Sequence, residues 1–178
     1  MLRKKNIFVI IGSASRNSGN LKLIDSFAEM TTAYFNLIIY NDLKKLPHFD
    51  PELTDHPPQA VADFRNLITN ADGVLICTPE YIFSIPSGLK NALEWCVSTS
   101  VFSDKPIGLI TASANGEKGH EELQLIMKTL MAKFNSETTL LIQGVKGKID
   151  SNGKLMHEET IKELNDFIIG FRRIVLND

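Results

Sequence analysis

The 178-residue sequence predicts a three-layer α/β fold, in which five parallel strands form a sheet with helices on both faces. Five short apolar runs show no alternation of apolar and polar residues, which is typical of strands buried on both faces of a parallel sheet. An amphipathic helical pattern follows each run, so strand and helix alternate five times. We expect a single domain over residues 1–178, because this length suits one buried core.

The pattern places each strand and helix along the chain. We expect the strands at residues 7–11, 37–40, 74–77, 107–110 and 139–142. The helices are marked by apolar residues three and four positions apart. These markers are, in order, Leu23, Ile24, Phe27 and Met30; Val61, Phe64 and Ile68; Leu89, Leu93, Cys96 and Val97; Leu123, Ile126, Met127 and Leu130; and Ile161, Leu164, Ile168, Phe171 and Val175.

Two connections are longer than the others. Residues 41–59 are polar and carry four prolines, and they fit equally well a segment that covers a site and a surface excursion without a role. Residues 146–157 contain the turn sequence Asp150-Ser151-Asn152-Gly153 and are expected to lead into the last helix.

Composition and charge exclude several classes of partner. The net charge of -2 predicts attraction neither to nucleic acid nor to a membrane surface. No stretch is long enough to span a bilayer, and the run 7–11 is too short for a signal peptide, so we expect a cytoplasmic protein. Cys77 and Cys96 fall at apolar positions and are interpreted as small buried hydrophobes. The four histidines show no metal-ligand spacing, and His120 is expected to be solvated.

The first loop, residues 12–21, joins a strand to a helix and therefore forms an anion site, where free N–H groups and the helix dipole point at the ligand. It has neither a P-loop lysine in register nor a G-x-G-x-x-G sequence. Its many side-chain donors suit a terminal phosphate monoester, such as that of FMN. The alternative is that Ser18 or Asn20 only caps the helix. The candidate residues are Ser13, Ser15, Arg16, Ser18, Asn20 and Leu21.

The loop after residues 74–77 is bracketed by two prolines. Pro79 ends the strand, Pro86 suits the first turn of the next helix, and Ser84 is a candidate cap. A rigid, apolar loop of this kind suits a backbone that lies against a flat ring. The residues between the prolines that we expect at the ring are Glu80, Tyr81, Ile82 and Phe83, together with Pro79.

Residues 79–81, 89–92 and Trp95 resemble the signature P-E-Y-N-x-S-x-P-G-x-L-K-N-A-[IL]-[DE]-W of the NAD(P)H-dependent FMN reductase family. The sequence departs from it at Ile82, where the family usually has Asn, and at Ser87, where Gly is usual. The first loop resembles the family's G-S-x-R-x-x-S-x-N, with Ser15 in the Arg position and Arg16 one place later.

A third loop, residues 111–120, resembles the small-residue loop of the same family. In that family, glycines in this loop let backbone amides approach the pyrimidine edge of the flavin. The residues that fit this role are Ser113, Gly116 and Gly119, with Asn115 between them. The alternative is an ordinary strand-to-helix turn.

The resemblance implies a flavodoxin-like sheet of order 2-1-3-4-5, in which the three loops meet at one crevice. It further implies an enzyme that passes hydride from NADPH or NADH through FMN to a small acceptor such as a quinone, an azo compound or free flavin. No side-chain nucleophile or metal is expected. A homodimer or dimer of dimers is implied, with Leu89, Glu94 and Trp95 as contributors.

Three other functions were weighed against this one. A response-regulator receiver needs acids where Gly12-Ser13 and Cys77-Thr78 stand, and a low-molecular-weight phosphatase needs a cysteine in the first loop. A flavodoxin-type electron carrier without pyridine-nucleotide activity is the serious alternative. Such carriers tend to be strongly acidic, and a net charge of -2 does not favour one.

Overall fold

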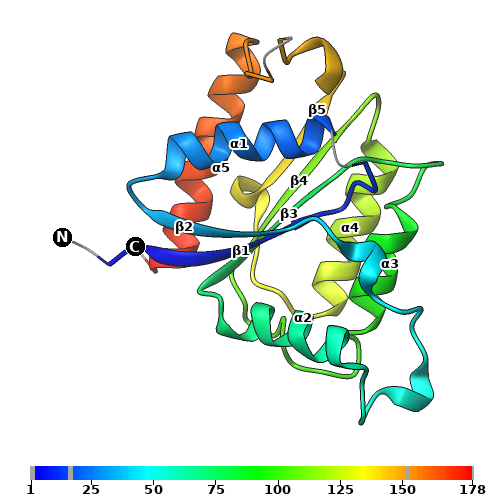
Figure 1. Ribbon diagram of the computed structural model, residues 1–178. Coiled ribbons are helices and arrows are strands. Elements are labelled where there is room, and N and C mark those ends of the chain that lie inside the picture. Colours follow the sequence, from blue (N-terminus) through cyan, green and yellow to red (C-terminus); the bar gives the residue numbers. More distant parts are fainter. Residues whose placement is uncertain (1–2, 16–17, 151–152, 178) are drawn as a thin grey trace.

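The computed structural model describes residues 3–15, 18–150 and 153–177. Five parallel strands form one sheet in the order β2-β1-β3-β4-β5, which confirms the predicted flavodoxin-like topology (Figure 1). Each strand includes the run predicted for it, and all but β5 extend it by at least two residues. The strands are β1 (Lys5–Ile11), β2 (Phe35–Tyr40), β3 (Gly73–Thr78), β4 (Ile107–Ser113) and β5 (Thr139–Gln143).

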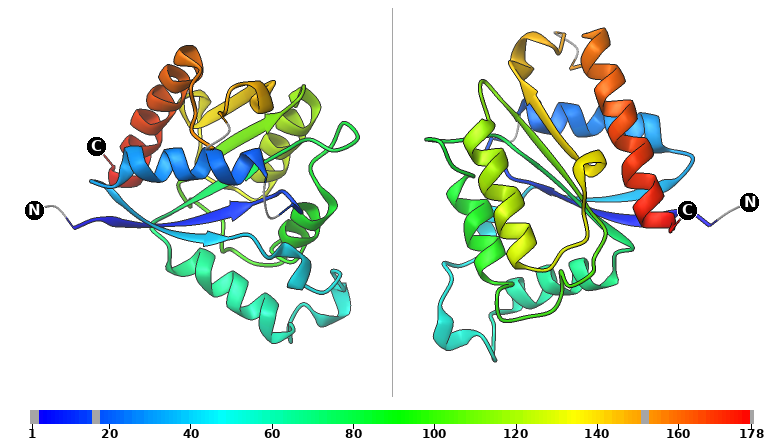
Figure 2. Two further views of the ribbon diagram at one scale, coloured as in Figure 1. Left: turned by 45° about the horizontal axis from the view of Figure 1, so that its top comes forward. Right: turned by 180° about the vertical axis from the view of Figure 1, so that it is seen from behind.

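Five helices cover both faces of the sheet, as the alternating pattern predicts. The helices α1 (Gly19–Thr31) and α5 (Glu158–Leu176) lie on one face, whereas α2 (Gln59–Asn70), α3 (Ser87–Glu94) and α4 (Glu117–Thr129) lie on the other (Figure 2).

Two separate hydrophobic cores explain why the strands read as continuous apolar runs. Within β1, Ile7 and Val9 belong to the core under α1 and α5, while Phe8 and Ile10 belong to the core under α2, α3 and α4. Since successive side chains of a strand point to opposite faces, both sets of residues are buried and no alternation remains in the sequence.

The third helix is shorter than predicted. It ends at Glu94, so Cys96 and Val97 lie beyond it; Cys96 is buried, but Val97 is 65% exposed. Trp95 directly follows the helix and is fixed by hydrogen bonds to two other segments of the chain. The Trp95 indole Nε1 donates to the carbonyl oxygen of Pro47 at 2.8 Å. The carbonyl oxygen of Trp95 accepts from Arg65 Nε at 2.8 Å.

The segment 41–59 folds against α3 rather than extending into solvent. Asn91 joins the two, because its Oδ1 accepts from Phe49 N at 2.7 Å and its Nδ2 donates to Pro47 O at 2.9 Å. The Phe49 ring meets the Trp95 ring edge-on, with 5.2 Å between centroids. This segment therefore has a fixed position next to α3.

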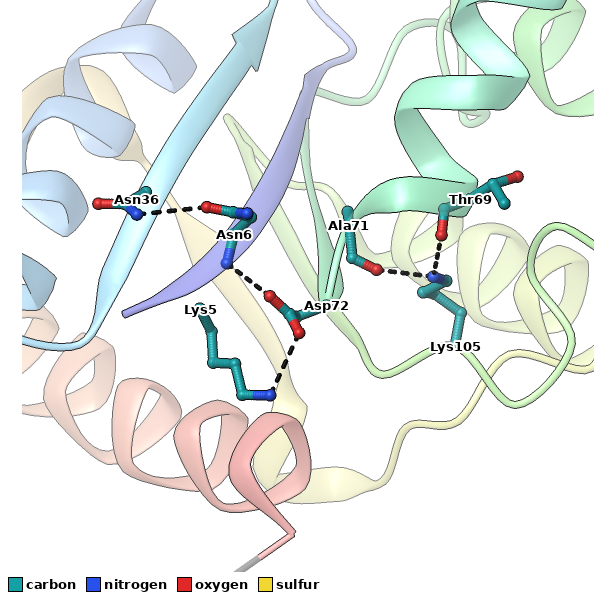
Figure 3. A network of polar contacts seen from close by, with 7 residues as sticks. All are labelled: Lys5, Asn6, Asn36, Thr69, Ala71, Asp72 and Lys105. Carbon is teal, nitrogen blue, oxygen red and sulfur yellow. Dashed lines mark hydrogen bonds and ion pairs between the residues drawn. The ribbon is translucent and has the colours of Figure 1, made fainter. Parts of the chain in front are cut away.

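A polar network closes the amino-terminal edge of the sheet (Figure 3). Asp72 accepts from Asn6 N at 2.8 Å and from Lys5 Nζ at 3.2 Å, while Lys105 Nζ donates to the carbonyl oxygens of Thr69 and Ala71. Partial burial raises the pKa of Asp72, but the hydrogen bonds from Asn6 N and from the positively charged Lys5 outweigh it and hold the pKa below its usual value. The loops that carry the predicted site residues follow β1, β3 and β4, and therefore lie at the opposite, carboxyl-terminal edge of the parallel sheet.

A helix that crosses a bilayer must be long and apolar. Within residues 3–15, 18–150 and 153–177, no helix is both long and apolar enough to cross a membrane.

Candidate functional site

The loops that follow β1, β3, β4 and β5 surround a cavity of about 620 Å³ at the carboxyl edge of the sheet. Its lining includes eight of the predicted site residues: Ser13, Ser15, Ser18, Asn20, Pro79, Glu80, Tyr81 and Ser113. Five predicted residues are not part of it: Leu21, Ile82, Phe83, Asn115 and Gly116. Arg16 lies outside the described residues. The three loops predicted to form one crevice therefore do meet there.

The first loop turns sharply into α1. Gly12 N donates to Cys77 O at 2.8 Å, and a Cβ at Gly12 would lie only 2.2 Å from Thr78 Oγ1, so no larger residue fits. Ser18 caps α1, since its Oγ accepts from Leu21 N at 3.2 Å. An accepting hydroxyl keeps its own hydrogen, which is therefore available to a ligand in the cavity.

Asn20 has a different role from the serines. Its side chain is buried, with Nδ2 donating to Ala112 O at 3.1 Å and Oδ1 accepting from the Cys77 thiol at 3.3 Å. Burial raises the pKa of the Cys77 thiol, which keeps its proton for this contact. Asn20 therefore ties α1 to β3 and β4, so its amide is occupied within the protein.

The second loop forms a tight turn, Tyr81–Ser84, at the tip of a hairpin. Tyr81 N donates to Ser84 O at 2.8 Å and Ser84 N to Tyr81 O at 3.1 Å. Both central residues have positive φ, +51° at Ile82 and +59° at Phe83, as a type I′ turn requires. Their side chains are 95% and 73% exposed, and the turn projects away from the body of the protein (Figure 1).

Glu80 joins the second loop to the third. Its Oε2 accepts from Gly119 N at 2.8 Å and its Oε1 from Gly116 N at 3.3 Å, at the amino terminus of α4. The resemblance implied that amides of this loop approach the flavin, and in the structure these two amides donate to the Glu80 carboxylate. The negative charge is placed where the helix dipole favours it. Asn115 Oδ1 accepts from Gln143 Nε2 at 2.8 Å.

Ser84 is not the helix cap that the sequence suggested. The residue that caps α3 is Pro86, whose carbonyl oxygen accepts from Leu89 N and Lys90 N. Ser84 Oγ instead donates to Glu122 Oε2 at 2.6 Å, and Ile85 N donates to the same oxygen at 3.0 Å. Partial burial raises the pKa of Glu122, but these hydrogen bonds and the nearby Lys90 outweigh it and hold the pKa below its usual value.

A second cavity, of about 630 Å³, adjoins the first and shares Ser13 and Tyr81 with it. The segment 41–59 supplies one wall through Leu43, Lys44, Leu46, His48 and Phe49, and the start of α3 supplies another. Of the two interpretations left open for this segment, the structure supports the one in which it borders a site.

The family model described as NADPH-dependent FMN reductase matches residues 5–144. The chain belongs to this family.

Proteins named for reductase or oxidoreductase activities are similar over nearly the whole chain. The NADH:(hydroxy)cinnamate reductase subunit CrdA of Vibrio ruber is 32% identical, over 96% of this chain and 86% of its own. A 2-hydroxy-1,4-benzoquinone reductase of a Burkholderia species is 31% identical, over 91% of each chain. Among solved structures, the flavoenzyme NAD(P)H:(acceptor) oxidoreductase FerB of Paracoccus denitrificans superposes with a TM-score of 0.86, at 24% identity, over 97% of this chain and 98% of its own.

Membership of the FMN reductase family confirms several expectations from the sequence. The protein is an NAD(P)H-dependent oxidoreductase that uses FMN, with the flavodoxin-like fold of its relatives. The comparisons support this function and not the alternative of a flavodoxin-type carrier. In the described part of the chain, no cluster of three or more His, Cys, Asp or Glu side chains offers a metal site.

Two features of the site in this FMN reductase differ from the sequence analysis. His120 is not solvated: it is half-buried, its Nδ1 lies 2.8 Å from Thr111 Oγ1, and burial lowers its pKa. Lys146 was missed, although it lines the first cavity from the turn after β5. The signal was its place directly after a strand of the parallel sheet, since such ends meet at one edge.

Proposed function

We propose that this enzyme holds FMN in the cavity of about 620 Å³ and reduces small-molecule acceptors with electrons from NADPH or NADH. The observation that carries the proposal is the pair of adjacent cavities with Ser13 and Tyr81 in common. One cavity has the size and the polar loop for a cofactor, and the other lies beside it for a nicotinamide and then an acceptor.

The residues of the first cavity fit the phosphate of FMN. The amino terminus of α1 points its N–H groups at this position, and the Ser18 hydroxyl retains a hydrogen to donate. Ser13 and Ser15 line the same region, and Lys146 brings a positive charge to it. A phosphate dianion would therefore meet hydroxyl donors, a helix amino terminus and a cation.

The hairpin fits the flavin ring. Pro79 and Tyr81 line the cavity, and we expect the backbone from Glu80 to Phe83 to lie along the ring. When bound, FMN supplies the two-electron chemistry, taking hydride from a reduced nicotinamide and passing the electrons to an acceptor. The protein's own groups bind and orient the ring, and the hairpin and segment 41–59 restrict water at its sides.

The acceptor that we propose is a planar, largely apolar compound such as a quinone, an azo compound or free flavin. Relatives named for a quinone and for azo reduction support this range. Tyr81, Phe49 and Leu46 give the second cavity apolar walls suited to a planar ring.

We also propose a single-domain, cytoplasmic protein that forms a homodimer or a dimer of dimers through α3 and α4. Leu89 and Trp95, expected to contribute, are fully buried within one chain and cannot do so. A small apolar groove between the two helices is lined by Leu93, Val97, Leu125, Ile126, Thr129 and Leu130. Lys90 and Glu94 on its rim carry opposite charges, which a second copy related by a two-fold axis would pair.

The proposed function is tested by binding and by reduction. Apoprotein is titrated with FMN, FAD and riboflavin, and we expect FMN to bind most tightly. The holoprotein is then mixed anaerobically with NADPH or NADH, which should bleach the flavin, and a quinone should restore its colour. Equal or tighter binding of FAD, or bleaching only by a separate reductase protein, would contradict the proposal.

A further inference from the structure

We propose that Glu122 is a positioning residue of the flavin site, which together with Glu80 holds the Tyr81–Ser84 turn in a strained conformation beside the cofactor cavity. The inference rests on the proposed function, because it is in that cavity that the turn would meet FMN.

The turn is strained by its own sequence. The left-handed region is unfavourable for a non-glycine residue, and a β-branched residue such as Ile82 is an outlier there. Hairpin turns of this type usually carry Asn or Gly for that reason. Burial of these two side chains does not offset the backbone strain, because Ile82 is 95% exposed and Phe83 is 73% exposed. Contacts outside the turn must therefore stabilise it.

Two carboxylates provide these contacts in a crossed arrangement. Glu80 stands on the first leg of the hairpin and accepts from the backbone of α4 at Gly116 and Gly119. Glu122 stands on α4 and accepts from the second leg at Ser84 and Ile85. Hydrogen bonds to an ionised group are about twice as strong as neutral ones, so the legs are fixed on both sides of the turn.

The arrangement matters for the cofactor because of what the turn presents. Within the described chain, the N–H groups of Ile82 and Phe83 make no hydrogen bond. Neither residue lines either of the two cavities, but the adjoining Tyr81 lines both. Donors aimed at a ring that gains electrons stabilise the added negative charge. If the backbone from Glu80 to Phe83 lies along the ring, as proposed above, the turn sets the direction of these donors and Glu122 holds the turn. Loss of Glu122 should then weaken the binding of reduced FMN more than that of oxidised FMN.

The first experiment uses apoprotein and does not depend on FMN. Backbone amide hydrogen exchange is measured at Tyr81 and Ser84 in the wild type, in Glu122→Gln and in the control Glu121→Gln. Glu121 directly precedes Glu122 on α4 and pairs with Lys118 on the exposed surface. We expect exchange about tenfold faster in Glu122→Gln, as for the loss of one charge-assisted hydrogen bond, and no change in Glu121→Gln.

The second experiment measures the affinity of the holoprotein for oxidised and for reduced FMN. In Glu122→Gln we expect affinity for reduced FMN to fall about tenfold and affinity for oxidised FMN to fall less than about threefold, so that the midpoint potential becomes more negative. Replacing Ile82 by Gly in the same variant removes the strain and should restore slow exchange at the turn.

The outcomes separate the two proposals. Unchanged exchange at Tyr81 and Ser84 in Glu122→Gln, or equal losses of affinity for both forms of FMN, would overturn the positioning role. A wild type that binds no FMN would instead overturn the proposed function, while the exchange measurement would still decide whether Glu122 holds the turn.

Discussion

Ser18 shows how one hydroxyl can serve both the fold and the ligand. Its oxygen accepts from Leu21 N, which satisfies a free N–H of the first turn of α1, while its hydrogen remains available to donate. The sequence left capping and phosphate binding as alternatives, but the geometry makes them compatible.

Replacing Ser18 by Ala should therefore weaken FMN binding about tenfold, as for the loss of one hydrogen bond to a charged group. It should also lower the free energy of unfolding of the apoprotein by about 1 kcal/mol through loss of the cap. Titration and urea unfolding measure the two effects. Riboflavin, which lacks the phosphate, should bind equally to both proteins, and Ser26→Ala on the same helix should change neither affinity. Equal losses for riboflavin and FMN would refute the phosphate contact.

Gly12 is required for close packing of the first loop. Replacing it by Ala should lower the free energy of unfolding by about 1–3 kcal/mol, because the new Cβ would overlap the Thr78 side chain. Gly147 provides the matched control, since a Cβ there would meet no atom within 4 Å. The Gly147→Ala variant should remain within about 0.5 kcal/mol of the wild type in the same urea titration. Similar values for both variants would show that the overlap is relieved by small shifts.

At the scale of elements, α4 and the hairpin form one unit at the mouth of the site. Glu80 and Glu122 join them, and neither contact was predictable from the sequence. Periodicity locates strands and helices because it reflects burial, which is why all five strands and five helices were placed. It does not reveal where a polar side chain on a loop will find its partner. The sequence analysis placed Glu80 at the ring and Ser84 as a helix cap. Their partners in the structure lie on α4, more than thirty positions further along the chain, and no local sequence pattern reveals contacts over that separation.

The unit formed by α4 and the hairpin should respond to pH through Glu122. Because its pKa is lower in the folded protein, its contribution to stability is complete above its unfolded pKa of about 4.3 and is lost as the pH falls through the folded value. Lys90 faces it from α3, with its Nζ 3.5 Å from Glu122 Oε1. The difference in unfolding free energy between the wild type and Glu122→Gln should therefore be constant above about pH 5 and shrink below it. A difference that is the same at pH 3 and pH 7 would exclude an ionic contribution.

At the scale of the whole molecule, the sheet order brings distant segments to one edge. β1 and β3 are neighbours, so the first two loops meet, and β4 and β5 add Ser113 and Lys146 to the same cavity. The expected strand order predicted that the loops after β1, β3 and β4 meet, but the contribution of Lys146 after β5 was missed. The sequence did not predict the second cavity, because the wall supplied by segment 41–59 depends on the contacts of Asn91 and Trp95 with Pro47.

The proposed dimer is tested by a charge in the groove between α3 and α4. Leu125 is 66% exposed there, and Leu125→Glu should shift the molecular mass measured by light scattering toward that of one chain. A buried, unpaired carboxylate at an interface is strongly unfavourable. The control is Ile169→Glu on α5, on the opposite face of the sheet, which should leave the mass unchanged. A wild type that is already monomeric would refute the dimer.

The start of β1 and the end of α5 lie close together, on the side of the protein away from the hairpin (Figures 1 and 2). Both belong to the amino-terminal edge of the sheet, where Lys5 and Asp72 close the polar network, and the two cavities open at the other edge. Attachment through either end, to an electrode or to a fusion partner, would therefore orient the molecule with its cavities facing the solution. An immobilised layer made in this way should exchange electrons with dissolved acceptors as freely as the unattached enzyme does.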